Sequence, residues 1–140
     1  MKRWAIRKPR SQDLDFIYAT WLNSYFGDSC YYHSVRKSVY KREYAKIIDR
    51  LLSISSILIA CKPDDEIVIY GYLVFEPRTI HYCYIKEAFR FSGMAKALIA
   101  TGVGKLDYVQ VSHQTNKLKP ILEKYPFLTY NPFILFKDLG

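Results

Sequence analysis

The order of patterns along the sequence predicts a single α/β domain built on a mixed sheet with helices on both faces. At 140 residues the chain has room for one hydrophobic core, so residues 1–140 are expected to form one domain. Two stretches with helical spacing of apolar residues come first, followed by three apolar stretches of strand length and then by alternating helices and strands. The expected order is therefore β-α-α-β-β-β-α-β-α-β.

The first half of the chain predicts one short strand and two amphipathic helices. Residues 4–7 alternate between apolar and polar side chains, which suits a short edge strand. A helix over 12–26 places its apolar side chains on one stripe, and Gly27 and Asp28 are expected to end it. A second helix over 38–53 has the same pattern, with its basic side chains largely off the apolar stripe.

The second half predicts the sheet. Three strands are expected first, separated by turns near Pro63 and Pro77, which fix the backbone at the entry of each turn. These strands cover residues 57–61, 67–75 and 79–86. The rest of the chain predicts a helix over 93–102, a strand over 106–111, a helix over 116–124 and a bent β segment over 127–136.

The chain is strongly basic, with a formal net charge of +8 and a pI of about 9.4. Most of the excess lies in residues 1–50, which hold 11 basic and 5 acidic side chains. Such a balance favours anionic partners, such as a phosphorylated cofactor or nucleic acid. Basic residues recur along the second predicted helix and just before it: Arg36, Lys37, Lys41, Arg42, Lys46 and Arg50. They could form a stripe that binds anions, or simply a solvent-exposed face of the helix.

The cysteines and the apolar segments point to a cytoplasmic protein. Cys30, Cys61 and Cys83 are an odd number at wide spacings, which suits reduced thiols better than a disulfide framework or a zinc site. The first ten residues carry the charges of a signal peptide without its apolar stretch, and no apolar run is long enough for a membrane span. No pattern of His, Cys and acidic residues predicts a metal site.

The most specific pattern is Arg90-Phe-Ser-Gly-Met-Ala95, between a predicted strand and a predicted helix. Consecutive backbone N–H groups at a helix N-terminus bind anions, supported by the helix dipole. Gly93 removes the Cβ where a phosphate would approach the backbone, and Arg90 and Lys96 add positive charge. An ordinary turn between a strand and a helix is the alternative for these six residues taken alone.

This Arg/Gln-x-x-Gly-x-Gly/Ala pattern resembles the pyrophosphate-binding motif of the GCN5-related N-acetyltransferase (GNAT) superfamily. The order of elements is similar over nearly the whole chain, although only 79–99 is specific to the motif, and small phage-borne members look most similar. The resemblance implies a GNAT fold and transfer of an acyl group, acetyl in the first instance, from acyl-CoA to an amine.

The resemblance also implies which residues bind acyl-CoA. The end of strand 79–86 would pair with the pantetheine arm, the following turn would bind the pyrophosphate, and Asn116 would orient the cofactor. The expected acyl-CoA-binding residues are Tyr84, Ile85, Lys86, Arg90, Phe91, Ser92, Gly93, Met94, Ala95, Lys96 and Asn116.

Two positions depart from the family pattern. The usual position of the general-acid tyrosine holds Leu122, so the nearby Tyr125 is the candidate proton donor to the leaving thiolate. The strand position that often holds a glutamate base is His81, which titrates near neutral pH and could take a proton from an ammonium group. Strand alternation predicts that His81, Cys83 and Ile85 share one face; a structural histidine is the alternative.

The acceptor is the least determined part of the prediction. Tyr31, Tyr32 and His33 lie in the loop that lines the acceptor pocket in the resembling family; they could stack on an acceptor or simply pack the loop. Leu122 and the basic first half leave two other interpretations open. One is a GNAT-shaped protein that binds nucleic acid or a protein partner without turnover, and the other is an acyltransferase acting on a nucleic-acid-linked amine. The sequence identifies neither the acceptor nor the oligomeric state.

Overall fold

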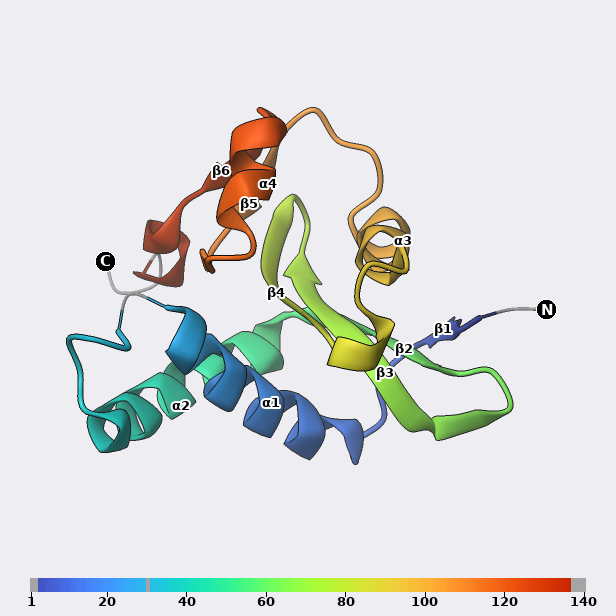
Figure 1. The fold of residues 1–140 in the computed structure, drawn as a ribbon, viewed down its shortest axis with the longest axis horizontal. Helices are drawn as coiled ribbons and strands as arrows, with labels where there is room; N and C mark the ends of the chain where they lie inside the picture. Colours follow the sequence, from blue (N-terminus) through green and yellow to red (C-terminus); the bar gives the residue numbers. More distant parts are fainter. Residues whose placement is uncertain (1–2, 30, 137–140) are drawn as a thin grey trace.

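The strands follow one another across the sheet in the order of the sequence (Figure 1). The computed structural model describes residues 3–29 and 31–136. Its strands are β1 Ala5–Arg7, β2 Ser56–Lys62, β3 Asp65–Glu76, β4 Thr79–Ile85, β5 Val109–Val111 and β6 Leu128–Tyr130. Its helices are α1 Asp13–Asp28, α2 Lys37–Ile54, α3 Met94–Gly102 and α4 Lys119–Lys124, with short 3₁₀ helices η1 Glu87–Phe89 and η2 Pro132–Phe136.

The first four strands pair antiparallel, whereas β5 is parallel to β4 and β6 is parallel to β5. A parallel pair needs a crossover connection, which α3 supplies for the first pair and α4 for the second. The predicted mixed sheet and order of elements are therefore confirmed.

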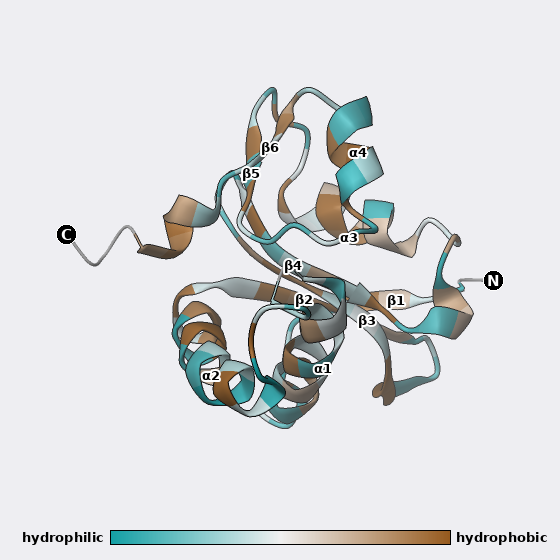
Figure 2. Cartoon of the chain, turned by 60° about the vertical axis from the view of Figure 1, so that its left-hand side comes forward, coloured by the Kyte–Doolittle hydropathy of each residue, from teal (hydrophilic) through white to brown (hydrophobic). Residues whose placement is uncertain are grey.

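The helices cover both faces of the sheet, as the sequence predicted. Helices α1 and α2 lie on one face, and α3 and α4 lie on the other (Figure 2). The core under α1 and α2 is rich in aromatic side chains, including Trp21, Tyr44, Tyr72 and Tyr82. The core under α3 is aliphatic, with Leu73, Met94, Leu98, Val109 and Val111.

Some predicted element ends are wrong by a few residues. Helix α1 continues through Gly27 to Asp28, because Gly27 does not take the left-handed backbone with which a glycine usually ends a helix. Helix α4 begins at Lys119 rather than at 116, because Pro120 fits the first turn of a helix but not its interior. The predicted strand over 106–111 shortens to β5.

A bulge interrupts the pairing of β4 with β3. Val74 pairs with Tyr82, but the next residue, Phe75, pairs with Ile80, so His81 is an extra residue in β4. As a result, Ile80 packs in the aliphatic core with Cys83, although strict alternation would put these two on opposite faces. Cys83 and Ile85 both pack against the aliphatic core, as the predicted alternation requires, whereas the bulge interrupts that alternation at His81.

The described cysteines are free thiols. Cys61 is buried, and burial raises the pKa of the partly buried Cys83 thiol to about 12. Cys30 lies outside the described residues. Within the described ranges, the helices are too short or too polar to span a bilayer, and the acidic, His and Cys side chains form no group that could hold a metal ion.

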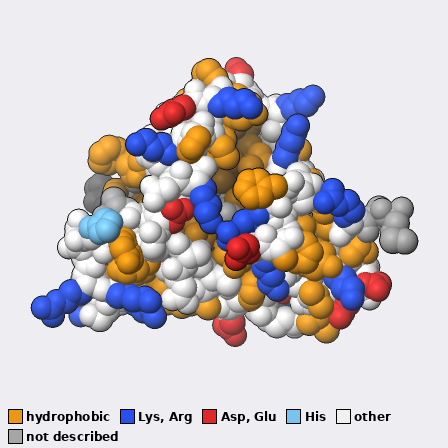
Figure 3. Space-filling view, in the orientation of Figure 1, with side chains coloured by type: hydrophobic (Ala, Val, Ile, Leu, Met, Phe, Trp, Pro, Cys, Tyr) orange, Lys and Arg blue, Asp and Glu red, His pale blue; other side chains and the backbone are white. Residues whose placement is uncertain are grey.

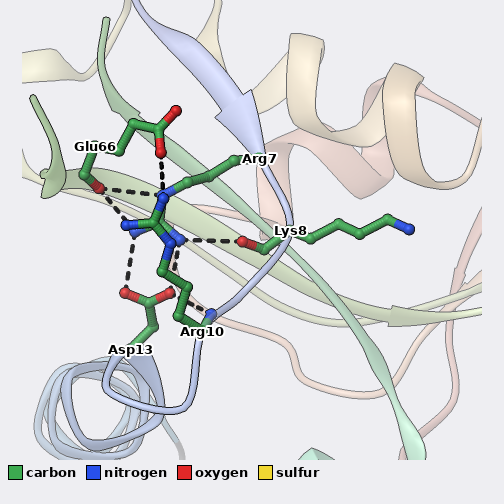
Figure 4. A network of polar contacts seen from close by, with 5 residues as sticks. All are labelled: Arg7, Lys8, Arg10, Asp13 and Glu66. Atoms are coloured by element: carbon green, nitrogen blue, oxygen red, sulfur yellow. Dashed lines mark hydrogen bonds and ion pairs between the residues drawn. The ribbon is translucent and has the colours of Figure 1, made fainter. Parts of the chain in front are cut away.

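A buried ion pair joins β1 to the start of α1 and to the hairpin between β2 and β3 (Figure 4). The Arg7 guanidinium donates to both carboxylate oxygens of Asp13, at 2.7 and 3.1 Å, and to the carbonyl oxygen of Glu66 at 2.8 Å. The Arg10 backbone N–H also donates to Asp13, at 2.7 Å. The hydrogen bonds from Arg7 hold the pKa of the Asp13 carboxyl below its ordinary value.

Replacing Asp13 by Asn should lower the free energy of unfolding by about 3 kcal/mol, because it leaves a largely buried guanidinium without its counter-charge. Since the folded-state pKa of Asp13 is depressed, its contribution is complete above about pH 4 and is lost as the pH falls through the folded value. Urea unfolding between pH 2 and 7 measures both effects, and the Asn variant should lose this part of the acid dependence.

The matched control is Glu66→Gln, which removes an exposed ion pair with Arg10 in the same network. It should cost less than about 1 kcal/mol, since water screens exposed pairs. Equal losses in both variants would contradict the role assigned to Asp13.

Candidate functional site

The site begins where β5 leaves β4. The two strands pair only at Thr79 and Ile80, and the Ser112 N–H donates to the Ile80 carbonyl at 3.1 Å. From Tyr82 to Ile85, within the described part of the chain, β4 has a paired strand only on its β3 side. Such an open edge offers backbone donors and acceptors to an extended ligand that carries amides.

A strained turn follows the open edge. The Phe89 ring stacks on Tyr70 of β3, with centroids 3.8 Å apart, and this contact fixes η1 against the sheet. Beyond it, Phe91 and Gly93 have left-handed backbones, with φ of 63° and 88°. Phe91 is fully exposed, so no packing explains a conformation that costs a bulky residue about 1–3 kcal/mol. Strain of this kind is typical of ligand-binding turns.

The turn leads into the N-terminus of α3. Gly93 is the N-cap, no described side chain caps the helix, and the first intrahelical bond runs from the Ala97 N–H to the Gly93 carbonyl at 3.0 Å. The N–H groups of Met94, Ala95 and Lys96 therefore lack intrahelical acceptors. A Cβ on Gly93 would meet nothing within 4 Å, so the space beside Gly93 is open. This arrangement suits an anion.

Positive side chains surround the same region. Arg90 Nε donates to the Ile85 carbonyl at 3.0 Å, Lys86 Nζ lies 5.3 Å from the centre of the Phe16 ring, and Lys96 is exposed. In the space-filling view the surface is hollowed between α3 and α4, with Lys and Arg side chains around the hollow (Figure 3). The predicted cofactor residues 84–86 and 90–96 lie at the end of β4, in the turn after η1 and at the start of α3.

A separate cavity of about 580 Å³ lies at the C-terminal end of α1. Tyr32 and His33, which were predicted to bind the acceptor, line it together with Asn116, which was predicted to bind the cofactor. Tyr31 is not among its lining residues and packs instead into the aromatic core. The cavity is also lined by Tyr25, Asp28, Lys119 and Tyr130, none of which was predicted from the sequence to belong to a site.

Gly71 lets β3 come close to the open end of β4. It pairs with Ile85, and a Cβ added at Gly71 would lie 2.6 Å from the Tyr84 carbonyl oxygen. Since that neighbour is backbone, the strands would have to separate to admit a side chain. The spacing of β3 and β4 beside the turn therefore depends on this glycine.

Tyr125, the predicted proton donor, follows α4 and is 40% exposed. Its ring lies 5.7 Å from that of Phe127 and 5.5 Å from Lys124 Nζ, so its ring contacts are with neighbours in sequence. Leu122, which holds the usual tyrosine position, packs against the aliphatic core. The role of Tyr125 stays a prediction.

His81, the predicted base, is buried, with only 1% of the residue exposed. Its Nε2 lies 2.7 Å from a carboxylate oxygen of Glu76, and its Nδ1 lies 2.7 Å from Ser112 Oγ. Both ring nitrogens are therefore engaged inside the protein. Sequence analysis did not single out Glu76 or Ser112; the polar pair Ser112-His113, directly after an apolar strand, was the available signal.

The basic stripe on α2 is partly neutralised by its own neighbours. Arg42 and Lys46 both pair with Glu43, at 3.0 and 3.2 Å, and Arg50 donates to the Leu135 carbonyl. Nucleic-acid binding by this helix stays a prediction.

In the GNAT fold the fourth and fifth strands of a mixed sheet diverge, and a turn after the fourth strand leads into the N-terminus of a helix. This chain has that fold. No protein-family model matches the chain, and no curated protein matches it in sequence.

Solved structures show the same fold. The apo form of Escherichia coli YjaB in solution is 14% identical, with a TM-score of 0.63 over 89% of this chain and 82% of that one. A Brucella melitensis GNAT family acetyltransferase, in complex with acetyl-CoA, is 16% identical, with a TM-score of 0.50 over 86% of this chain and 82% of that one. A GCN5-related N-acetyltransferase from Rhodopseudomonas palustris is 17% identical, with a TM-score of 0.50 over 72% of this chain and 64% of that one.

Replacing Gly71 by Ala should lower the free energy of unfolding by about 1–3 kcal/mol, because the new methyl group collides with the β4 backbone. Gly27→Ala is the matched control: a Cβ there meets nothing within 4 Å, and alanine favours the helix by roughly 0.5–1 kcal/mol. Urea unfolding of the two variants should therefore give opposite signs. A neutral Gly71 variant would contradict the close approach of β3 and β4.

Proposed function

We propose that this protein transfers an acyl group, acetyl in the first instance, from acyl-CoA to an amine. The observation that carries the proposal is the open edge of β4 followed directly by a strained turn and an uncapped helix. Pantetheine contains two amides in an extended chain, and a strand edge can pair with them. The pyrophosphate would bind the N–H groups at the start of α3, with Arg90 and Lys96 nearby.

In this arrangement catalysis consists mainly of positioning. The pantetheine arm would direct the thioester along β4 toward the point where β5 diverges, and N–H groups of the open edge would polarise its carbonyl. The amine nitrogen attacks the carbonyl carbon, a C–N bond forms, and the C–S bond breaks. Tyr125 is the proposed proton donor to the CoA sulfur, and the proton that the nitrogen loses as the amide forms returns to Tyr125, so that CoA leaves as a thiol.

The cavity at the end of α1 is the proposed acceptor site. Asp28 lines it, the negative end of the α1 dipole faces the same region, and the last turn of α1 has no basic residue. The rings of Tyr25, Tyr32 and Tyr130 add aromatic surface, which attracts cations and planar groups. We therefore infer an acceptor with a protonated primary amine next to an aromatic or other planar group.

The other sequence-based expectations take no part in this proposal. A cytoplasmic location and a phage-borne origin remain expectations. Nucleic-acid binding, with or without turnover, has no structural observation in its favour beyond the basic charge.

Acetyl-CoA should bind the parent protein in a calorimetric titration, and Gly93→Glu should weaken binding by about 100-fold or more, since its carboxylate would face the pyrophosphate. Gly104→Glu is the matched control. Gly104 also has a left-handed backbone, with φ of 79°, and open space around it, but it lies beyond the other end of α3. It should keep the parent affinity within about twofold. Absence of binding to the parent, or equal losses in both variants, would sink the cofactor assignment.

Tyramine and tyrosol test the acceptor site, because tyrosol has a hydroxyl group where tyramine has its ammonium group. Tyramine should bind about tenfold more tightly, because a charge-assisted hydrogen bond to Asp28 contributes about 1.5 kcal/mol. NMR titration should show shifts of cavity residues, and Asp28→Asn should remove the preference while still accepting from the Asn116 N–H, 3.2 Å away. Equal affinities for the two probes would contradict the proposed acceptor class.

A further inference from the structure

A chain of hydrogen-bonded side chains crosses the buried interior from β3 to α2. Glu76 contacts His81 at 2.7 Å, His81 contacts Ser112 at 2.7 Å, and Ser112 contacts His113 Nδ1 at 2.7 Å. His113 Nε2 lies 2.5 Å from the Tyr44 hydroxyl. His81, Ser112 and His113 are each at most 2% exposed, whereas the Glu76 side chain is 20% exposed.

The far end of this chain reaches the proposed acceptor cavity. The side chain of Tyr44 lies against that of Tyr25, with ring centroids 5.3 Å apart. Tyr25 in turn lines the cavity at the end of α1. The chain from Tyr25 to Glu76 thus connects the cavity to a carboxylate that water can reach.

One arrangement of protons lets every contact in this hydrogen-bonded series donate in the same direction. Burial, with a contribution from His81, lowers the pKa of His113 to about 3, so His113 carries a single ring proton. Burial also raises the pKa of the Tyr44 phenol, which therefore keeps its proton and can donate it to His113 Nε2. In this arrangement His113 Nδ1–H donates to Ser112 Oγ, Ser112 donates to His81 Nδ1, and His81 Nε2–H donates to the Glu76 carboxylate.

We propose that this chain carries the proton of the acceptor amine from the cavity to Glu76, an inference that rests on the acyl transfer proposed above. The ammonium gives a proton to the Tyr25 oxygen, and each group passes its own proton to the next. The last transfer runs from His81 Nε2 to Glu76, which releases the proton to water. The amine nitrogen is left with the free electron pair that attacks the thioester.

Burial favours a concerted shift of these protons. A phenolate at Tyr44 or a cation at His113 would be a charge in the interior, which the raised and lowered pKa values oppose. In a concerted shift neither charge forms. His81 then acts inside the chain, away from direct contact with the substrate, which accounts for its burial and for the engagement of both its ring nitrogens.

The first test needs no substrate. Long-range ¹H–¹⁵N spectra of the full chain, labelled at histidine, should show the proton of His81 on Nε2 and that of His113 on Nδ1 at neutral pH. The reverse assignment at either ring would overturn the proposal.

The second test reverses the direction of donation along the hydrogen-bonded side chains. Glu76→Lys replaces an acceptor by an ammonium, which only donates, so His81 must accept at Nε2 and carry its proton on Nδ1. If the chain is continuous, Ser112 turns its proton to His113, whose own proton moves to Nε2. Adding Ser112→Ala should restrict the change to His81. A change at His81 alone in the single variant would overturn the proposal.

The third test measures turnover with acetyl-CoA and tyramine as probes. Ser112→Ala should lower the rate by about 100-fold or more, without changing acetyl-CoA affinity by calorimetry. Ser24→Ala is the matched control, because Ser24 makes a 2.6 Å hydrogen bond to Tyr82 in the same core but is not in the chain. It should leave the rate and both tautomers unchanged. Equal rates in the two variants would overturn the proton path.

The outcomes separate this inference from the function on which it rests. If acetyl-CoA does not bind the parent protein, the proposed function fails, and the tautomers still decide whether the chain is continuous. If acetyl-CoA binds and the histidines carry the opposite protons, the proton path fails while the cofactor site stands.

Discussion

The divergence of β4 from β5 is the constraint on which the rest of the site depends. The two strands pair at only two positions, and the bulge at His81 follows immediately. Beyond it the β4 edge is open, and α3 is placed so that its N-terminus follows that edge. The same divergence lets the segment after β5 turn toward α2, so that Ser112 and His113 enter the core rather than extend the sheet. The open edge of β4 and the buried series of hydrogen-bonded side chains are two consequences of one break in strand pairing.

The aromatic core makes such a polar chain possible. Trp21 stacks on Tyr82, with ring centroids 5.0 Å apart and planes 4° from parallel, and the His113 ring packs edge-on against Trp21. Tyrosine buries a large apolar ring yet brings one hydroxyl that needs a partner. A core built from many tyrosines therefore contains internal donors and acceptors, and burial keeps these phenols protonated, as the raised pKa of Tyr82, about 12, illustrates.

The sequence predicted what local patterns determine. Apolar periodicity located the helices and strands, and the run from Arg90 to Ala95 located the turn, because its residues are adjacent in the chain. The partners of His81 could not be predicted in this way. Ser112 is 31 residues from His81, and Tyr44 is 69 residues from His113, so their contacts depend on the packing of three separate elements. The bulge at His81 likewise has no signature in the sequence, so counting along the strand could not predict it.

The two halves of the site differ in the kind of group that builds them. The proposed cofactor half consists mainly of backbone: a strand edge, a left-handed turn and a helix N-terminus. Backbone groups persist when side chains change, provided the fold persists, and solved structures share this fold at 14–17% identity. The acceptor half consists of side chains such as Asp28, Tyr25 and Tyr32, and these are free to differ between proteins that share the fold. The proposed acceptor must therefore be inferred from the cavity of this chain alone.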